Sequence, residues 1–186
     1  MKTYSRREFI GAGTAGTLAA MYLKSGSLLP FSTPFNWPLS FQSYGVREMI
    51  GKDFDGTLRK LKSIGYSGIE MCSPKGYTES GFGPLTAFSA EDLRKKIEDA
   101  DLFCKSCHFQ HPELKPDKIQ ETISYGKKLG LKDLVLSAFW IKEDATLDEW
   151  KSAADEMNKS AELVKKAGLQ MVYHNHSIGP VLNGEQ

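Results

Sequence analysis

The sequence has few cysteines, no long apolar run and almost no net charge. Three cysteines in 186 residues are too few for a disulfide scaffold. No run of about 18 apolar residues is present, so a membrane-spanning helix is not expected. Lys plus Arg number 24 and Asp plus Glu 23, which is not the basic surplus of a nucleic-acid binder. With 40% hydrophobic and 25% charged residues, the composition is that of a globular protein.

The amino-terminal segment has the features of an export signal. A paired arginine, Arg6-Arg7, is followed by Phe9 and then by a weakly apolar segment rich in glycine and alanine. This pattern resembles a twin-arginine signal. An amphipathic helix is the alternative, but the glycines of the segment would weaken it. We therefore assign residues 1–36 to a signal and linker, assign residues 37–186 to a folded domain, and expect a periplasmic protein.

The remainder of the chain repeats a helix, a glycine turn and a strand. Short apolar runs predict strands at residues 39–46, 69–72, 103–109, 134–139 and 171–176. Amphipathic patterns between them predict helices, the clearest over residues 147–167. Three helices are predicted to end in lysines followed by Gly65, Gly130 or Gly168. Strands joined by helices are parallel, so the fold class is α/β. The pattern alone fits both an open doubly wound sheet and a (β/α)₈ barrel.

Ionisable residues cluster where the predicted strands end. Glu70 lies in the second strand, His108 in the third, and His174 and His176 in the fifth. The carboxyl ends of parallel strands share one rim, where α/β proteins carry their chemistry. Two imidazoles two residues apart in a buried strand would share a face and could bind metal or transfer protons. The alternatives are a hydrogen-bonded, half-buried His108 and a Glu70 that pairs with a lysine.

Other motifs predict structure more than chemistry. Cys104 and Cys107 have the spacing of a redox motif, but residues three apart on a strand face opposite sides, which favours core cysteines. His111, in a loop beside a proline, is predicted to lie on the surface. The long segment 73–89 is either a lid over the rim or a disordered connection.

Several motifs resemble the sugar phosphate isomerase/epimerase family, which has the xylose isomerase-like TIM-barrel fold. They are the Leu-Ser-Phe-Gln-Ser-Tyr-Gly-Val-Arg run at residues 39–47, the Ile-Gly-Tyr-Ser-Gly-Ile-Glu run at 64–70, Cys-His at 107–108 and Tyr-His-Asn-His at 173–176. The resemblance runs over five of the family's eight strands. It implies four βα units and the fifth strand of a barrel, in a chain truncated after that strand and able to associate through its open strand edges.

The resemblance also implies an activity and residue roles. It implies isomerisation or epimerisation of a small sugar through an enediolate, assisted by a divalent metal such as Mn, Mg, Co or Zn. The implied catalytic residues are Glu70, His108 and His174; the implied substrate-binding residues are Gln42, Tyr44 and His176. The acid that follows the His-Asn-His string in many relatives is missing here, and Glu185 is the one candidate left for a metal ligand. The alternatives are a sugar lyase or hydrolase on the same scaffold, and a non-catalytic carbohydrate-binding fragment.

Overall fold

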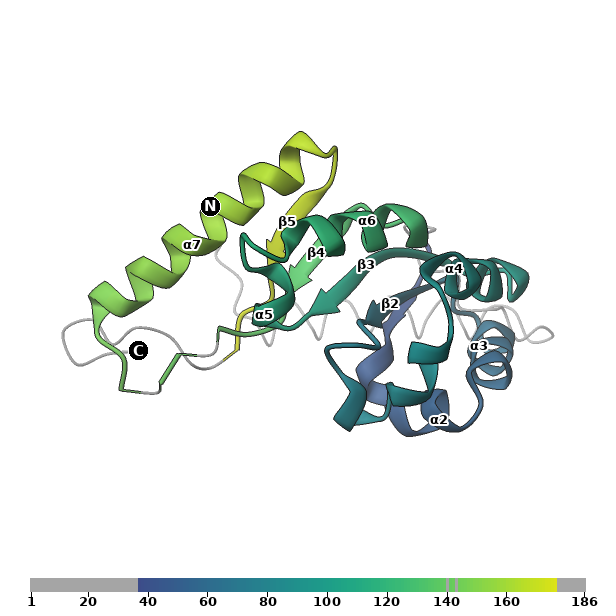
Figure 1. Ribbon diagram of the computed structural model, residues 1–186. Coiled ribbons are helices and arrows are strands. Elements are labelled where there is room, and N and C mark those ends of the chain that lie inside the picture. Colours follow the sequence, from purple (N-terminus) through teal and green to yellow (C-terminus); the bar gives the residue numbers. More distant parts are fainter. Residues whose placement is uncertain (1–36, 140, 143, 177–186) are drawn as a thin grey trace, which may run out of the picture. The chain divides into compact units, whose positions relative to one another are not determined.

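The computed structural model describes residues 37–139, 141–142 and 144–176, and its folded unit starts at Pro38. Strands alternate with helices along this unit (Figure 1). The strands are β1 (Ser40–Gln42), β2 (Gly68–Cys72), β3 (Phe103–Phe109), β4 (Asp133–Leu136) and β5 (Gln170–Tyr173). The helices are η1 (Ser43–Val46), α2 (Arg47–Lys52), α3 (Phe54–Ser63), η2 (Thr78–Ser80), η3 (Gly83–Ala87), α4 (Ala90–Asp99), α5 (His111–Leu114), α6 (Ile119–Leu129) and α7 (Leu147–Lys166), where η marks a 3₁₀ helix. The predicted export signal and Glu185 lie outside the described residues.

The strand order distinguishes between the two predicted architectures. All neighbouring strands are parallel, and they follow the order β1-β2-β3-β4-β5. A doubly wound sheet reverses its order at a switch point, whereas a barrel adds each strand beside the previous one. The covering helices also contact in chain order, α3 with α4, α4 with α6, and α6 with α7 (Figure 1). The fold is therefore that of part of a (β/α)₈ barrel.

Two helices begin at capping boxes, and α6 ends at one of the predicted glycines. Helix α4 starts at a capping box in which Ser89 and Asp92 exchange hydrogen bonds, and α7 starts at an equivalent box formed by Thr146 and Glu149. Helix α6 ends at Gly130, which has a left-handed φ of 87°. These caps fix the length of each helix and therefore the point where the next strand begins.

Alternation along the strands gives the sheet one apolar and one polar face. Ile69 and Met71 of β2 are 2% and 0% exposed and belong to the hydrophobic core. Leu93 and Ile97 of α4 belong to the same core. Glu70, between the two apolar residues of β2, points to the opposite face. The polar face is therefore the face of the sheet on which a functional site is expected.

The first and last strands are shorter than predicted. Strand β1 ends at Gln42, because the Gln42 side chain accepts a hydrogen bond from the backbone N–H of Tyr44 and thereby caps η1. Strand β5 ends before His174, so His174 and His176 follow the strand. The His174 N–H still donates to a β4 carbonyl at 2.9 Å, which extends the ladder by one residue.

A β-bulge interrupts the pairing of β2 with β3. Ile69 pairs with Cys104 and Met71 with Cys107, so β3 has one extra residue in this interval. The partners of Cys104 and Cys107 in β2 are two residues apart, so the two cysteines face the same side of the sheet. The prediction that they face opposite sides was wrong. Both thiols are free and buried, which confirms that they are core cysteines.

The connection from β2 to α4, residues 73–89, is packed into the core. It contains η2 and η3, and Tyr77, Phe82 and Leu85 are only 6%, 0% and 2% exposed. Tyr77 and Phe82 pack edge to face, with ring centroids 6.1 Å apart. The expectation of a lid or a disordered connection was wrong, because buried aromatic side chains anchor the segment.

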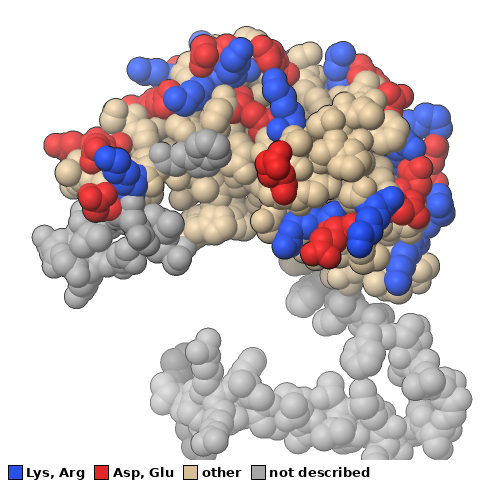
Figure 2. Space-filling view, turned by 60° about the horizontal axis from the view of Figure 1, so that its bottom comes forward, with Lys and Arg blue, Asp and Glu red and all other residues tan. Residues whose placement is uncertain are grey.

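Positive and negative side chains lie interspersed on the face shown in Figure 2. Several form short-range ion pairs, such as Arg94 with Glu98 and Lys95 with Asp99 along α4. This mixture is the surface expected from the near-balance of charges in the sequence. Among the described residues, no helix is long and apolar enough to cross a membrane.

Candidate functional site

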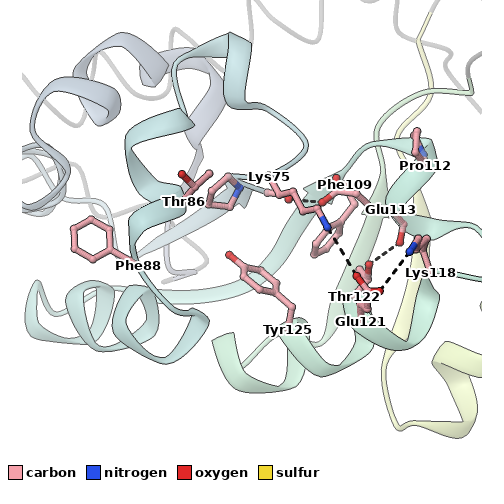
Figure 3. Close-up of a pocket in the computed structure, with 12 residues that line it drawn as sticks. Lys75, Thr86, Phe88, Phe109, Pro112, Glu113, Lys118, Glu121, Thr122 and Tyr125 are labelled. Carbon is pink, nitrogen blue, oxygen red and sulfur yellow. Dashed lines mark hydrogen bonds and ion pairs between the residues drawn. The ribbon is translucent and has the colours of Figure 1, made fainter.

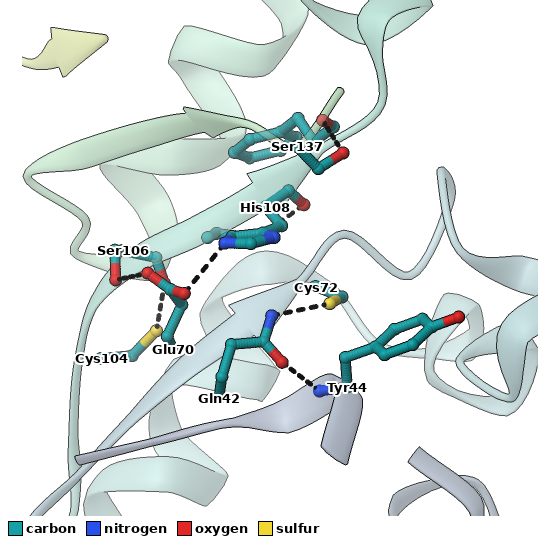
Figure 4. Close-up of polar contacts among 10 residues, drawn as sticks. Gln42, Tyr44, Glu70, Cys72, Cys104, Ser106, His108 and Ser137 are labelled. Carbon is teal, nitrogen blue, oxygen red and sulfur yellow. Dashed lines mark hydrogen bonds and ion pairs between the residues drawn. The ribbon is translucent and has the colours of Figure 1, made fainter. Parts of the chain in front are cut away.

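Strands β2 and β3 bring Glu70 and His108 together on the polar face of the sheet (Figure 4). Glu70 Oε1 lies 2.9 Å from His108 Nε2, and the side chains are 28% and 8% exposed. The partner of Glu70 is therefore an imidazole and not the lysine considered as an alternative. This pair combines an acid and a base in a partly buried environment.

Ser106 completes the contacts of the carboxylate. Its hydroxyl donates to Glu70 Oε2 at 2.5 Å. The extra residue in β3 turns the side chains of Ser106 and His108 to the same face of the sheet as Glu70. Both can therefore contact the Glu70 carboxylate. The sequence did not predict Ser106 as a site residue, since the bulge leaves no recognisable signal in its composition.

The surroundings of Glu70 favour its ionised form. Burial acts to raise the pKa of the carboxyl group, but hydrogen bonds with His108 and Ser106 and the charges of His108 and His174 outweigh it. The pKa of Glu70 therefore lies below its ordinary value of 4.5. At neutral pH the site holds a carboxylate that can fix the His108 ring in place.

Two further imidazoles extend the group beyond β5. The ring centroids of His108 and His174 are 5.0 Å apart, and those of His174 and His176 are 4.9 Å apart. The prediction of a buried pair was wrong, because both residues are exposed beyond the end of the strand. Desolvation and the neighbouring charges of His108 and His176 lower the pKa of His174 below 6.5. A neutral imidazole at this position can accept a proton.

Gln42 and Tyr44 lie beside the group at the end of β1. Gln42 pairs in register with Glu70, and its amide nitrogen donates to the Cys72 thiol at 3.3 Å. Tyr44 is 42% exposed, and the Arg47 guanidinium lies over its ring, 4.5 Å from the centroid. These two of the three predicted substrate-binding residues therefore have different surroundings: the Gln42 amide is engaged in local contacts, whereas the Tyr44 side chain is accessible.

The described residues do not fit a divalent metal. Among them, no group of three or more His, Cys, Asp or Glu side chains is arranged to hold an ion. Both Glu70 oxygens already contact His108 and Ser106. We therefore derive no chemical step through a metal from these residues.

His111 does not lie on the surface as predicted. Its side chain is 12% exposed, and Nε2 lies 3.4 Å from Glu156 Oε2 of α7. Its ring packs near Phe139, with centroids 6.1 Å apart. The short helix α5 turns this residue inward, so the His111 side chain connects α5 to α7.

Comparison with known proteins identifies the fold. No protein-family model and no curated protein matches the chain. A solved structure described as a sugar phosphate isomerase/epimerase from Parabacteroides distasonis is similar to it, with 24% identity and a TM-score of 0.60. The similarity covers 83% of this chain and 56% of that one.

Two other solved structures agree. A probable 3-DHS dehydratase involved in petrobactin synthesis in Bacillus anthracis has 11% identity and a TM-score of 0.56, over 78% of this chain and 54% of its own. An IOLI protein with a bound zinc atom has 16% identity and a TM-score of 0.53, over 74% and 51%. The chain thus spans about half the length of these proteins. It has the fold of part of a (β/α)₈ barrel, like that of the sugar phosphate isomerase/epimerase structure from Parabacteroides distasonis.

Proposed function

We propose that Glu70, His108 and His174 belong to the active site of a sugar isomerase or epimerase of the sugar phosphate isomerase/epimerase family. The observation that carries this proposal is the 2.9 Å contact between the Glu70 carboxylate and His108, with the His174 ring beside it. The likeness of the fold to a structure described as a sugar phosphate isomerase/epimerase supports it. The proposal concerns the part of the site that these five strands supply.

The geometry suits proton transfer next to a carbonyl group. A neutral His174 would remove a proton from the carbon beside the sugar carbonyl, and the electron pair of that bond would form an enediolate. Delivery of the proton to the neighbouring carbon, with the hydroxyl proton moving from one oxygen to the other, gives the isomer. A proton delivered by a second acid on the opposite face of the same carbon gives the epimer. His108, held by Glu70, would bind the oxygen that gains charge. Tyr44 and His176 would contact the sugar, whereas Gln42 would hold Tyr44 in place.

A solvent-exchange experiment tests this function. The protein is incubated in deuterated water with a panel of aldoses, ketoses and their phosphates, and deuterium at the carbon beside the carbonyl is followed by NMR. We expect exchange, or conversion to an isomer or epimer, with at least one sugar. Product analysis separates this reaction from that of a lyase or hydrolase, which would break a carbon–oxygen bond. An absence of exchange with every sugar would contradict the proposal.

The pH dependence should report on His174. Its pKa is below 6.5 through burial and the charges of His108 and His176, opposed by Glu70. The neutral base form therefore persists as the pH falls past 6.5, and kcat/KM should decline only below that value. A profile from about pH 5 to pH 8, measured for the protein and for His174→Gln, checks this. A decline centred at or above pH 6.5, or the same decline in the variant, would exclude His174 as the base.

We also propose that the protein is exported through the twin-arginine pathway, on the basis of Arg6 and Arg7. Fractionation of producing cells should find the protein in the periplasm. The double substitution Arg6→Lys/Arg7→Lys should retain it in the cytoplasm. An unchanged distribution of the double variant would contradict this assignment.

A further inference from the structure

We propose that the chain has a second binding site, the outer cleft, which takes a small aromatic carboxylate. The outer cleft lies between the segment after β2 and helices α5 and α6 (Figure 3) and has a volume of about 560 Å³. This volume falls within the range of about 300–1,000 Å³ that is typical of ligand pockets. The cleft shares no lining residue with the group around Glu70.

The walls of the outer cleft suit a flat apolar body. Phe88 stands on one side, while Phe109 and Tyr125 form the other, with their rings perpendicular and 6.1 Å apart. Phe88 is 37% exposed, so part of its ring faces solvent when nothing covers it. An aromatic ring inserted between these side chains would remove apolar surface from water on both faces.

Two lysines give the cleft an anion-binding end. Lys75 and Lys118 approach it from different segments, and both reach Glu121, at 3.8 Å and 3.6 Å. Their side chains are 82% and 56% exposed, so these ion pairs contribute little stability. A ligand carboxylate could therefore share the two ammonium groups with Glu121 at small cost.

The second acid in the wall, Glu113, has both oxygens in hydrogen bonds, and its only interaction with the two lysines in the cleft is electrostatic, with Lys75. One of its oxygens accepts a hydrogen bond from the Ser73 hydroxyl at 2.6 Å, and the other accepts one from the Gln110 N–H at 2.8 Å. Glu113 therefore builds the wall, and the charged groups at the open end are the two ammonium groups and the Glu121 carboxylate between them.

The hydroxyl of Tyr125 supplies the remaining polar group. It is buried, and it has no hydrogen-bond partner within the part of the chain that the structure describes. In Figure 3 it points away from α6 toward the opposite wall of the cleft, where Thr86 and Lys75 lie. A buried donor without a partner is unfavourable, and an oxygen on the ligand ring would satisfy it. These features favour a carboxylate with an oxygen-bearing aromatic ring.

The test uses 4-hydroxyphenylacetate as the probe and its uncharged amide as the matched ligand. Binding to the full chain is followed by titration calorimetry and by NMR shifts. We expect saturable binding of the carboxylate with a Kd at least about tenfold below that of the amide. No saturable binding of the carboxylate up to about 10 mM, or equal binding of the amide, would overturn the proposal.

Substitutions locate the site. The double variant Lys75→Met/Lys118→Met should raise the Kd of the carboxylate about tenfold or more, and Tyr125→Phe should raise it several-fold. Lys128→Met is the control, since Lys128 lies on α6 but outside the cleft and pairs with Glu91. His174→Gln should leave binding unchanged. An unaltered Kd in the double variant, or a loss of binding in His174→Gln, would overturn the assignment to the outer cleft.

Discussion

Replacing Glu70 by glutamine should lower kcat/KM for the sugar substrate by about 10²–10⁴-fold without unfolding the protein. Glutamine has nearly the same shape, and its amide oxygen can still accept the Ser106 hydrogen bond. It lacks the negative charge that faces His108 Nε2 at 2.9 Å. The imidazole would lose its ionic partner, and the charge that develops in the transition state would be less well stabilised.

The matched control is Glu98→Gln. Glu98 is exposed and pairs with Arg94 along α4, so this substitution removes an equal charge far from the rim. Rates come from the exchange assay, and circular dichroism reports folding. The assigned role of Glu70 would be contradicted if Glu70→Gln retained the rate of Glu98→Gln while both variants were folded.

Replacing Phe82 by alanine should reduce the free energy of unfolding by about 3–5 kcal/mol. Phe82 is fully buried although it lies in a connection between a strand and a helix. Its removal would leave a cavity beneath Tyr77, whose ring packs against it. Urea unfolding followed by circular dichroism measures the change as a shift of the midpoint.

Phe88→Ala is the control for this substitution, because Phe88 belongs to the same segment but is 37% exposed. Its loss should reduce the free energy of unfolding by less than about 1 kcal/mol. If Phe82→Ala were no more harmful than Phe88→Ala, the segment would not be anchored as the structure indicates.

The repeating pattern made much of the fold predictable. The caps at Ser89 and Thr146 and the glycine at Gly130 are local signals, and each marks a helix boundary in the structure. The order of the strands could not be predicted from the pattern, because the periodicity of helices and strands is the same in a barrel and in a doubly wound sheet. The family resemblance resolved that choice, and the strand order confirms it.

The site was predictable only in part. The rim position of Glu70 and His108 follows from their place in successive parallel strands, and they are in contact. Ser106 was missed because a bulge depends on how two strands pair, which the sequence of one strand does not reveal. The inward turn of His111 depends on a contact with α7, far along the chain. Segment 73–89 was wrongly predicted to be a lid or a disordered connection because it is rich in glycine and polar residues. Its three buried side chains, Tyr77, Phe82 and Leu85, anchor it in the core.

The bulge in β3 determines which side chains of this strand face the site. If β3 paired regularly with β2 from Ile69↔Cys104 onward, with no bulge, Cys107 would lie opposite Cys72. His108 would then turn toward the helices, because every side chain of β3 beyond the bulge would change face. The bulge therefore keeps His108 on the face of Glu70, where regular pairing would place the Cys107 thiol beside that of Cys72. Neighbouring thiols in an oxidising compartment can be joined into a disulfide, so the bulge also keeps Cys72 and Cys107 out of the pairing that would favour one.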